Sequence, residues 1–245
     1  MVLPKPTTPI YELVLPSTEK TIKYRPILVK EEKILLLAVE TKDTKVITDA
    51  IKQILKGCIL TKGIKVEELP TFDIEYIFLN VRGKSVGEAI ELIVTCQDDG
   101  VTEVPVTVYI DEIQVQKNPE HSRDIKLHND LILRMKYPSL TQFIKDNFDF
   151  SAGVSIDTST TLDKSFDIVT SCMDMVFNQE DTWSASDCTK KELVEFIEGL
   201  SNQQFKQIDI FFQTMPKLSH TFTVINPKTK KENEVTLEGL TSFFG

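Results

Sequence analysis

The tripeptide Gly83-Lys84-Ser85 is the part of this sequence closest to a nucleotide-binding motif, because it matches the end of a phosphate-binding P-loop. In a P-loop, glycine amides cradle the phosphate and the lysine neutralises its charge. The motif needs another glycine five positions earlier, where this chain has Phe78. A P-loop also follows a strand, whereas a helical segment is expected before Gly83. The sequence therefore predicts no nucleotide site and no cofactor.

Metal chemistry would need cysteine, histidine or carboxylate ligands close enough to converge on one ion. The four cysteines, Cys58, Cys96, Cys172 and Cys188, form no Cys-x-x-Cys pair, and His121, His128 and His220 are widely spaced. Cys96 precedes a Gln-Asp-Asp-Gly turn like half of a zinc knuckle, but the second cysteine is absent. We expect reduced cysteines and no metal site. A small metal-binding module built on Cys58 and Cys96 stays open as an alternative.

Acidic residues are the other groups that could do chemistry. Residues 165 to 189 contain neither lysine nor arginine but five carboxylates: Asp167, Asp174, Glu180, Asp181 and Asp187. A glycosidase uses such a pair of carboxylates, yet the pattern is more typical of a solvated face or of a surface that binds a basic partner. We therefore expect Asp174, Glu180 and Asp181 to bind a partner. The acidic triplet Glu192, Glu195 and Glu198 is expected on the solvated side of its helix.

No catalytic residues are predicted. Nucleophilic catalysis needs a base oriented beside the nucleophile, and the chain has no Gly-x-Ser-x-Gly motif. The three histidines lie in polar surroundings in the sequence. The sequence is therefore interpreted as that of a protein that is not an enzyme.

Composition limits the classes of partner. The chain has 245 residues, of which 41% are hydrophobic and 27% charged, as in a soluble globular protein. Its formal net charge of -9 repels nucleic acid phosphates and anionic membranes. The first residues do not form a secretory signal, and no apolar run approaches the length of a membrane span. We expect neither a nucleic acid partner nor a membrane.

The two ends of the chain are candidate contact segments. Residues 1–10 are rich in proline and threonine and are expected to form an extended arm. The arm is either laid across a partner or simply frayed, and Pro4, Pro6, Ile10 and Tyr11 are its candidate contacts. At the other end, Phe243 and Phe244 gain stability only when covered, either by the body of the protein or by a neighbour.

The elements expected before Pro138 are mostly hairpins. Strand-like residues 11–15 and 21–24 flank a turn, and residues 91–96 and 103–113 form the clearest hairpin in the chain. Helices are expected over residues 30–40, 43–58 and 70–80, and strands over 124–127 and 131–135.

The elements expected after Pro138 are mostly helices. One begins at Ser139, a longer one covers Leu162 to Phe177, and two more begin at capping-box patterns at Thr189 and Ser201. Residues 221–225 and 233–237 form a last hairpin. The predicted fold is α+β: the N-terminal half consists of β-hairpins with two to three helices, and the C-terminal half is mainly helical with a terminal β-hairpin. The expected domains are the arm 1–10, an α+β domain 11–137 and a mainly helical domain 138–245.

Long strings in the first half resemble one family. They are residues 4–17, PKPTTPIYELVLPS; residues 22–33, IKYRPILVKEEK; and residues 69–87, LPTFDIEYIFLNVRGKSVG. These strings resemble the baseplate hub proteins of T4-type myoviruses, the relatives of the product of T4 gene twenty-six. The resemblance covers about the first half of the chain. It implies a protein needed to build the central hub of the baseplate in the host cytoplasm, with no catalytic residues.

The resemblance and the residues together predict an interaction protein. We expect a structural or chaperone-like assembly subunit of the baseplate hub of a contractile phage tail, either in the virion or in the host cytoplasm during assembly. Its expected partners are other hub proteins, in a hetero-oligomeric assembly. The alternative from another class is a tail-associated hydrolase that acts on cell-wall material.

Overall fold

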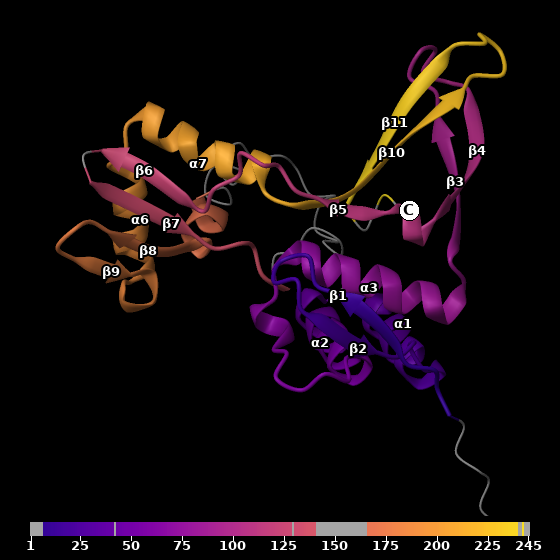
Figure 1. The fold of residues 1–245 in the computed structure, drawn as a ribbon, viewed down its shortest axis with the longest axis horizontal. Coiled ribbons are helices and arrows are strands. Elements are labelled where there is room, and N and C mark those ends of the chain that lie inside the picture. Colours follow the sequence, from indigo (N-terminus) through magenta and orange to yellow (C-terminus); the bar gives the residue numbers. More distant parts are fainter. Residues whose placement is uncertain (1–6, 42, 129, 141–165, 240–241, 243–245) are drawn as a thin grey trace, which may run out of the picture.

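The computed structural model describes residues 7–41, 43–128, 130–140, 166–239 and 242. These residues form three parts (Figure 1). Residues 7–86 build an N-terminal body. Two β-hairpins, residues 89–109 and 217–238, project from it as an arm. Residues 124–135 and 166–214 build a second body on the other side of the molecule.

The N-terminal body packs one hairpin on three helices. Strands β1 (Tyr11–Val14) and β2 (Thr21–Tyr24) are antiparallel. The helices are α1 (Val29–Glu40), α2 (Thr44–Cys58) and α3 (Thr71–Val86), with the short 3-10 helix η1 (Val66–Glu68) before α3. These elements confirm the hairpin and the three helices predicted for this part of the chain.

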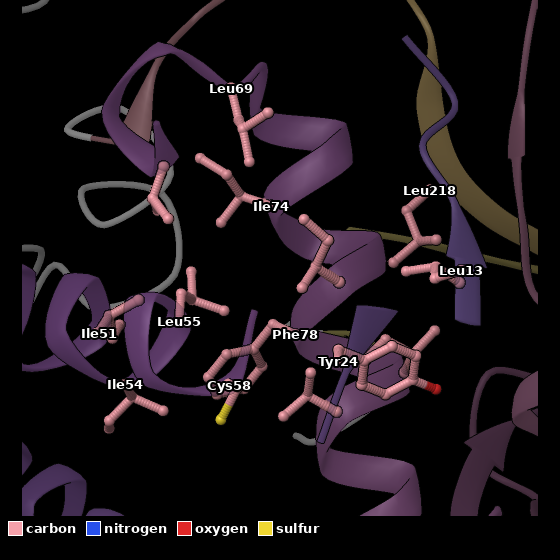
Figure 2. Close-up of a cluster of buried hydrophobic side chains, with 14 of the residues drawn as sticks. Leu13, Tyr24, Ile51, Ile54, Leu55, Cys58, Leu69, Ile74, Phe78 and Leu218 are labelled. Atoms are coloured by element: carbon pink, nitrogen blue, oxygen red, sulfur yellow. The ribbon is translucent and has the colours of Figure 1, made fainter. Parts of the chain in front are cut away.

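Helix α2 supplies one wall of the N-terminal core. The carboxylate of Asp43 caps its first turn by accepting the amide protons of Lys45 and Val46. The apolar stripe predicted from spacing is fully buried and consists of Ile47, Ile51, Ile54, Leu55 and Cys58. Figure 2 shows four residues of this stripe, Ile51, Ile54, Leu55 and Cys58, in one cluster with Ile74 and Phe78 of α3. Leu218, from near the end of the chain, belongs to the same cluster. The N-terminal core therefore includes a residue that is distant in sequence.

An ion pair fixes the start of α1. The guanidinium of Arg25 donates to both carboxylate oxygens of Glu31, with N–O distances of 2.8 and 2.6 Å. The amide of Leu28 also donates to this carboxylate, at 2.9 Å, and the thiol of Cys58 lies 3.9 Å from it. Both charged side chains are largely buried, and each lowers the energy of the other's charged form. The pair thereby joins β2, α1 and the end of α2.

The arm consists of two hairpins packed face to face. Strands β3 (Ala89–Thr95) and β4 (Glu103–Tyr109) form one hairpin, and β10 (Lys217–Ile225) and β11 (Glu232–Glu238) form the other. Both hairpins were predicted. Val94, Cys96 and Val224 are buried between them. At the base of the arm, the 3-10 helix η2 (Ile110–Glu112) leads into the short strand β5 (Gln114–Gln116), which pairs with β10.

Hydrogen bonds lock the two hairpins at the tip of the arm. The carboxylate of Asp98, in the first turn, accepts from the amide of Asn226 at 2.8 Å and from the hydroxyl of Thr229. The backbone amide of Asp98 donates to the side-chain oxygen of Asn233 at 2.9 Å. Asn226 is fully buried, so its polar atoms must be paired inside the protein. This cluster, the tip latch, ties together turns that are more than 120 residues apart.

The second body is a four-stranded antiparallel sheet with helices on one face. Its strand order is β6 (Asp124–His128), β7 (Leu131–Met135), β8 (Met173–Phe177) and β9 (Thr182–Ser184), followed by the 3-10 helix η3 (Ala185–Asp187). Helices α6 (Lys190–Glu198) and α7 (Asn202–Thr214) begin with the predicted capping boxes at Thr189 and Ser201. Ile197, Ile208 and Phe211 of these helices pack on Leu133 and Met135 of the sheet.

The predicted distribution of helices and strands is wrong. The N-terminal half contains the two longest described helices, α3 and α2, together with α1, whereas residues beyond 138 contribute four strands, β8 to β11. The main error lies in residues 162–177, expected as one helix: residues 166–171 are helical, but β8 begins at Met173. Side chains of Met, Val and Phe fit either a buried helix or a central strand, and pairing with β7 and β9 decides the outcome. The predicted domain boundaries stay predictions, and the predicted helix that begins at Ser139 falls mostly on residues 141–165, outside the described part.

An aromatic cluster joins the two bodies. Phe72 of α3 contacts Tyr137 edge-on, with ring centroids 5.0 Å apart, and Tyr137 stacks on Phe211 of α7 at 5.9 Å. The amide of Thr71 donates to the carbonyl of Pro138 at 2.9 Å. Tyr137 and Pro138 therefore connect the second body to the start of α3.

The neutral form of His121 completes this cluster. Its Nδ1 lies 2.9 Å from the hydroxyl of Thr214, which donates its own proton to the carbonyl of Ile210, so Nδ1 must carry the hydrogen. Its Nε2 then accepts from the hydroxyl of Tyr137 at 3.1 Å. Burial, and secondarily the charge of Arg123, lowers the pKa of His121 below its ordinary value.

We predict that the Glu31→Ala substitution lowers the free energy of unfolding by about 3 kcal/mol, because it leaves the guanidinium of Arg25 buried without its carboxylate. Chemical denaturation measures this change. Glu12→Ala is the matched control, since it breaks an exposed contact with Lys23 of 3.6 Å, and we expect a much smaller change. Equal effects of the two variants would contradict the assigned role of the ion pair.

We also predict that acid weakens the protein through His121. Because the folded state lowers the pKa of His121, the unfolded state binds the proton more readily, and stability falls as the pH drops below about 6.5. Denaturation curves at pH 7.5 and 5.5 measure this loss, and the His121→Gln variant should show a smaller difference between the two pH values. His128→Gln serves as the control, and an unchanged pH dependence in His121→Gln would refute the assignment.

Candidate interaction surfaces

The tripeptide Gly83-Lys84-Ser85 has a structural role in α3. A methyl group on Gly83 would lie 2.3 Å from Cδ1 of Ile110, so glycine allows the base of the arm to approach the helix. The ammonium of Lys84 pairs with Glu88 and lies 4.9 Å from the centre of the Tyr11 ring. The hydroxyl of Ser85 accepts from the amide of Ile27 at 2.8 Å. These contacts explain the three residues without a phosphate.

The cysteines do not converge. Cys58 is buried in the N-terminal core, Cys96 between the hairpins of the arm and Cys172 in the second body, whereas Cys188 is partly exposed. Burial raises the pKa of Cys58 to about 12 and that of Cys172 to about 11. Within the described residues, no three histidine, cysteine or acidic side chains are close enough to hold a metal ion. The two cysteines of the metal-binding alternative thus lie in different cores.

The predicted contact residues near the ends of the chain are only partly described. Pro4, Pro6, Phe243 and Phe244 lie outside the described residues. Ile10 precedes β1 and is 62% exposed. The ring of Tyr11 packs against Tyr24, at 5.7 Å between centroids, and is partly buried on the N-terminal core. Of the described pair, Ile10 is therefore the more accessible.

The predicted acidic contacts lie on a sheet rather than on a helix. Asp174 is on β8 and contacts the guanidinium of Arg123 at 3.4 Å. Glu180 and Asp181 are exposed in the turn between β8 and β9, where both backbone amides donate to the side chain of Asn178. The turn holds the two carboxylates outward, free of ion pairs among the described residues. Their role in binding a partner stays a prediction.

Helix α1 carries an apolar surface that sequence reasoning missed. Val29, Leu36 and Leu37 are 83%, 62% and 53% exposed, and Val46 at the start of α2 is 42% exposed. We call these four residues the α1 face. Val29 and Leu36 are two helical turns apart, so they lie on the same side of α1. The sequence does contain a signal for this surface, the unbroken apolar run from Ile34 to Val39. Six consecutive helical residues point to all sides of the helix, so one buried stripe cannot cover all of them.

A groove follows α6 in the second body. Its first part is a hollow of about 330 Å³ between α6 and the edge of the sheet, bordered by Trp183, Leu193 and Phe196. Its second part, of about 470 Å³, continues towards Leu200 and Gln204. Leu131 and Phe196 line both parts, so the two hollows adjoin at these side chains. We call this feature the α6 groove.

None of the described helices is long and apolar enough to cross a membrane.

Comparison with known families decides the class of the protein. A family model described as T4 bacteriophage base plate protein matches residues 8–245. The chain belongs to this family. The match includes the arm and the second body, which the resemblance of the first half did not reach. Neither the curated proteins nor the solved structures yield a match.

Membership in the T4 base plate family indicates the general role of the chain. The chain is a structural protein of the phage baseplate, located at the virion tail, and it contacts other baseplate proteins. Such a protein must present surfaces to its neighbours, and an exposed contiguous apolar surface is the usual mark of one. The α1 face and the α6 groove are the two such surfaces that we consider for this base plate protein.

We predict that Cys188 is the fast-reacting thiol of the native protein, because the other three cysteines are buried. Titration with an aromatic disulfide reagent should show one thiol reacting at least about tenfold faster than the rest. Denaturant should make all four react, and Cys188→Ser should remove the fast phase. Two or more fast thiols in the native protein would contradict the described burial.

Proposed function

We propose that this base plate protein is a non-enzymatic subunit or assembly factor of the central hub of a contractile tail, and that it acts by binding other hub proteins in a hetero-oligomeric complex. The α1 face carries this proposal. Three apolar side chains of α1 and one of α2 are exposed to solvent, and covering them removes their surface from water.

The position of the α1 face within the chain supports the assignment to the hub. Val29 lies inside the string from Ile22 to Lys33 that resembles hub proteins. Arg25 and Glu31, which form the buried ion pair, belong to the same string. The residues that resemble the hub family are thus the residues that position the exposed helix.

The ends of the chain would extend this contact surface. Ile10, whose side chain is exposed, is the last residue of the proline-rich N-terminal segment 1–10. A proline-rich segment loses little conformational entropy when it binds a partner in extended form. In the proposal, Pro4, Pro6 and Ile10 contact one neighbour and Phe243 and Phe244 are covered within the assembly. The exposed carboxylates of Glu180 and Asp181 offer a further contact to a basic neighbour.

We predict that the double substitution Leu36→Ser and Leu37→Ser weakens binding to other hub proteins at least about tenfold, because these side chains form the centre of the α1 face. Co-purification of a tagged chain with co-expressed hub proteins measures the binding. The melting temperature should be nearly unchanged, since both side chains are already exposed.

The control for this experiment is Leu60→Ser, a similar loss of an exposed leucine outside the α1 face. Equal recovery of hub proteins by all variants would refute the role of the α1 face. Clearing of peptidoglycan in a zymogram, abolished by replacing one carboxylate, would instead establish the hydrolase alternative. Mass spectrometry of purified particles distinguishes a retained subunit from an assembly factor that leaves.

A further inference from the structure

The α6 groove exists because the sheet of the second body is wider than the helix that covers it. In the strand register, Leu133 of β7 lies beside Val176 of β8, and Val176 lies beside Trp183 of β9. All three therefore point to the helical face of the sheet. Leu133 is fully buried, whereas Trp183 on the edge strand is 47% exposed. The short helix α6 thus leaves the last strand uncovered.

The lining of the α6 groove suits a protein side chain better than a small polar ligand. Among the described residues, Glu192 is the one charged residue that lines the first hollow, and its carboxylate accepts hydrogen bonds from the amide and the hydroxyl of Thr189. Small-molecule sites need a few polar groups that orient the ligand, and the other residues that line this hollow are uncharged. An exposed tryptophan beside an apolar hollow is instead typical of a protein–protein anchor point.

The charge around the α6 groove selects a basic occupant. Glu195 lies in the second hollow, and its ammonium partner among the described residues is the exposed Lys191, at 3.6 Å. At the other end, Asp187 of η3 and the carboxylates of Glu180 and Asp181 flank β9. The nearby Lys190 is paired with Asp167 at 2.7 Å. Glu195 thus lines the second hollow, and Asp187 is next in sequence to Cys188, which lines the first. A basic surface is the complement of these acidic groups.

We propose that the α6 groove binds a basic amphipathic segment of a neighbouring baseplate protein. One apolar side chain of that segment sits between Trp183 and Phe196, and its lysine or arginine residues face Glu195 and Asp187. Helix α6 has nine residues and thus a length of about 13 Å, enough for two or three turns of a bound helix. The proposal rests on the proposed function, and it names a second contact surface that is distinct from the α1 face.

Cys188 allows a direct test because it lines the first hollow and is the one partly exposed cysteine of the chain. The rate of labelling with a small maleimide is compared between the free protein and its complex with hub proteins. We expect labelling in the complex to be at least about tenfold slower, since the bound segment covers the thiol. An equal rate would overturn the groove proposal while leaving the proposed function intact. Failure to form any complex would instead count against the proposed function.

The chemistry of the occupant is tested with a maleimide–succinimide cross-linker anchored at Cys188. The expected product joins Cys188 to a lysine of another baseplate protein, in a segment with apolar neighbours. Products with Lys190 and Lys191 also form in the free protein and serve as the background. A cross-link to a second copy of this chain, or no link to another protein, would overturn the assignment of a basic partner segment.

Substitutions complete the test. Trp183→Lys and Glu195→Lys should each lower the yield of the cross-link at least about tenfold, because the first places a charge in the groove and the second reverses the rim charge. Glu120→Lys is the control for Glu195→Lys, since it replaces a glutamate with a lysine on a loop outside the groove. The circular dichroism spectrum of each variant verifies its fold. Equal yields from all three variants would refute the proposed contact.

Discussion

The ion pair between Arg25 and Glu31 is the contact on which the exposed surface of the N-terminal body depends. Helix α1 buries little apolar surface of its own: Ala38 is its one apolar residue below a tenth exposure. Its start is held by the carboxylate of Glu31, which receives the guanidinium of Arg25 and the amide of Leu28. A polar anchor of this kind leaves Leu36 and Leu37 of α1 available for contact, whereas a hydrophobic anchor would bury them.

In the other two parts as well, one set of residues stabilises the structure and another apolar residue stays exposed. In the arm, the tip latch and the buried Val94 and Val224 hold the hairpins together, and Ile93 on the outer face stays exposed. In the second body, α6 and α7 hold the sheet, and Trp183 stays exposed at its edge. Each part thus offers at least one large apolar side chain to solvent, as expected of a protein that works inside a larger assembly.

Local signals in the sequence predicted local structure well. The capping boxes at Thr189 and Ser201, the buried stripe of α2 and the hairpins of the arm all follow from spacing and turn chemistry over fewer than 25 residues. The layout of the halves was wrong because the pairing of β8 with β7 joins residues about 40 apart and leaves no periodic signal. The α6 groove was missed for the same reason. The apolar run from Ile34 to Val39 signals the α1 face, but which of its residues are exposed depends on the neighbours that fail to cover them.

The path of β10 has a consequence for how the polypeptide reaches this shape. Leu218 completes the N-terminal core, and β10 also pairs with β5 and packs on β3 and β4. During synthesis, these contacts cannot form until β10 has been made, which is about a hundred residues after β5 ends at Gln116. Contacts so distant along the chain slow folding and leave strand edges unpaired in the meantime. Newly synthesised chains therefore expose unpaired strand edges for a time. Early association with a neighbouring subunit would cover these edges and prevent aggregation.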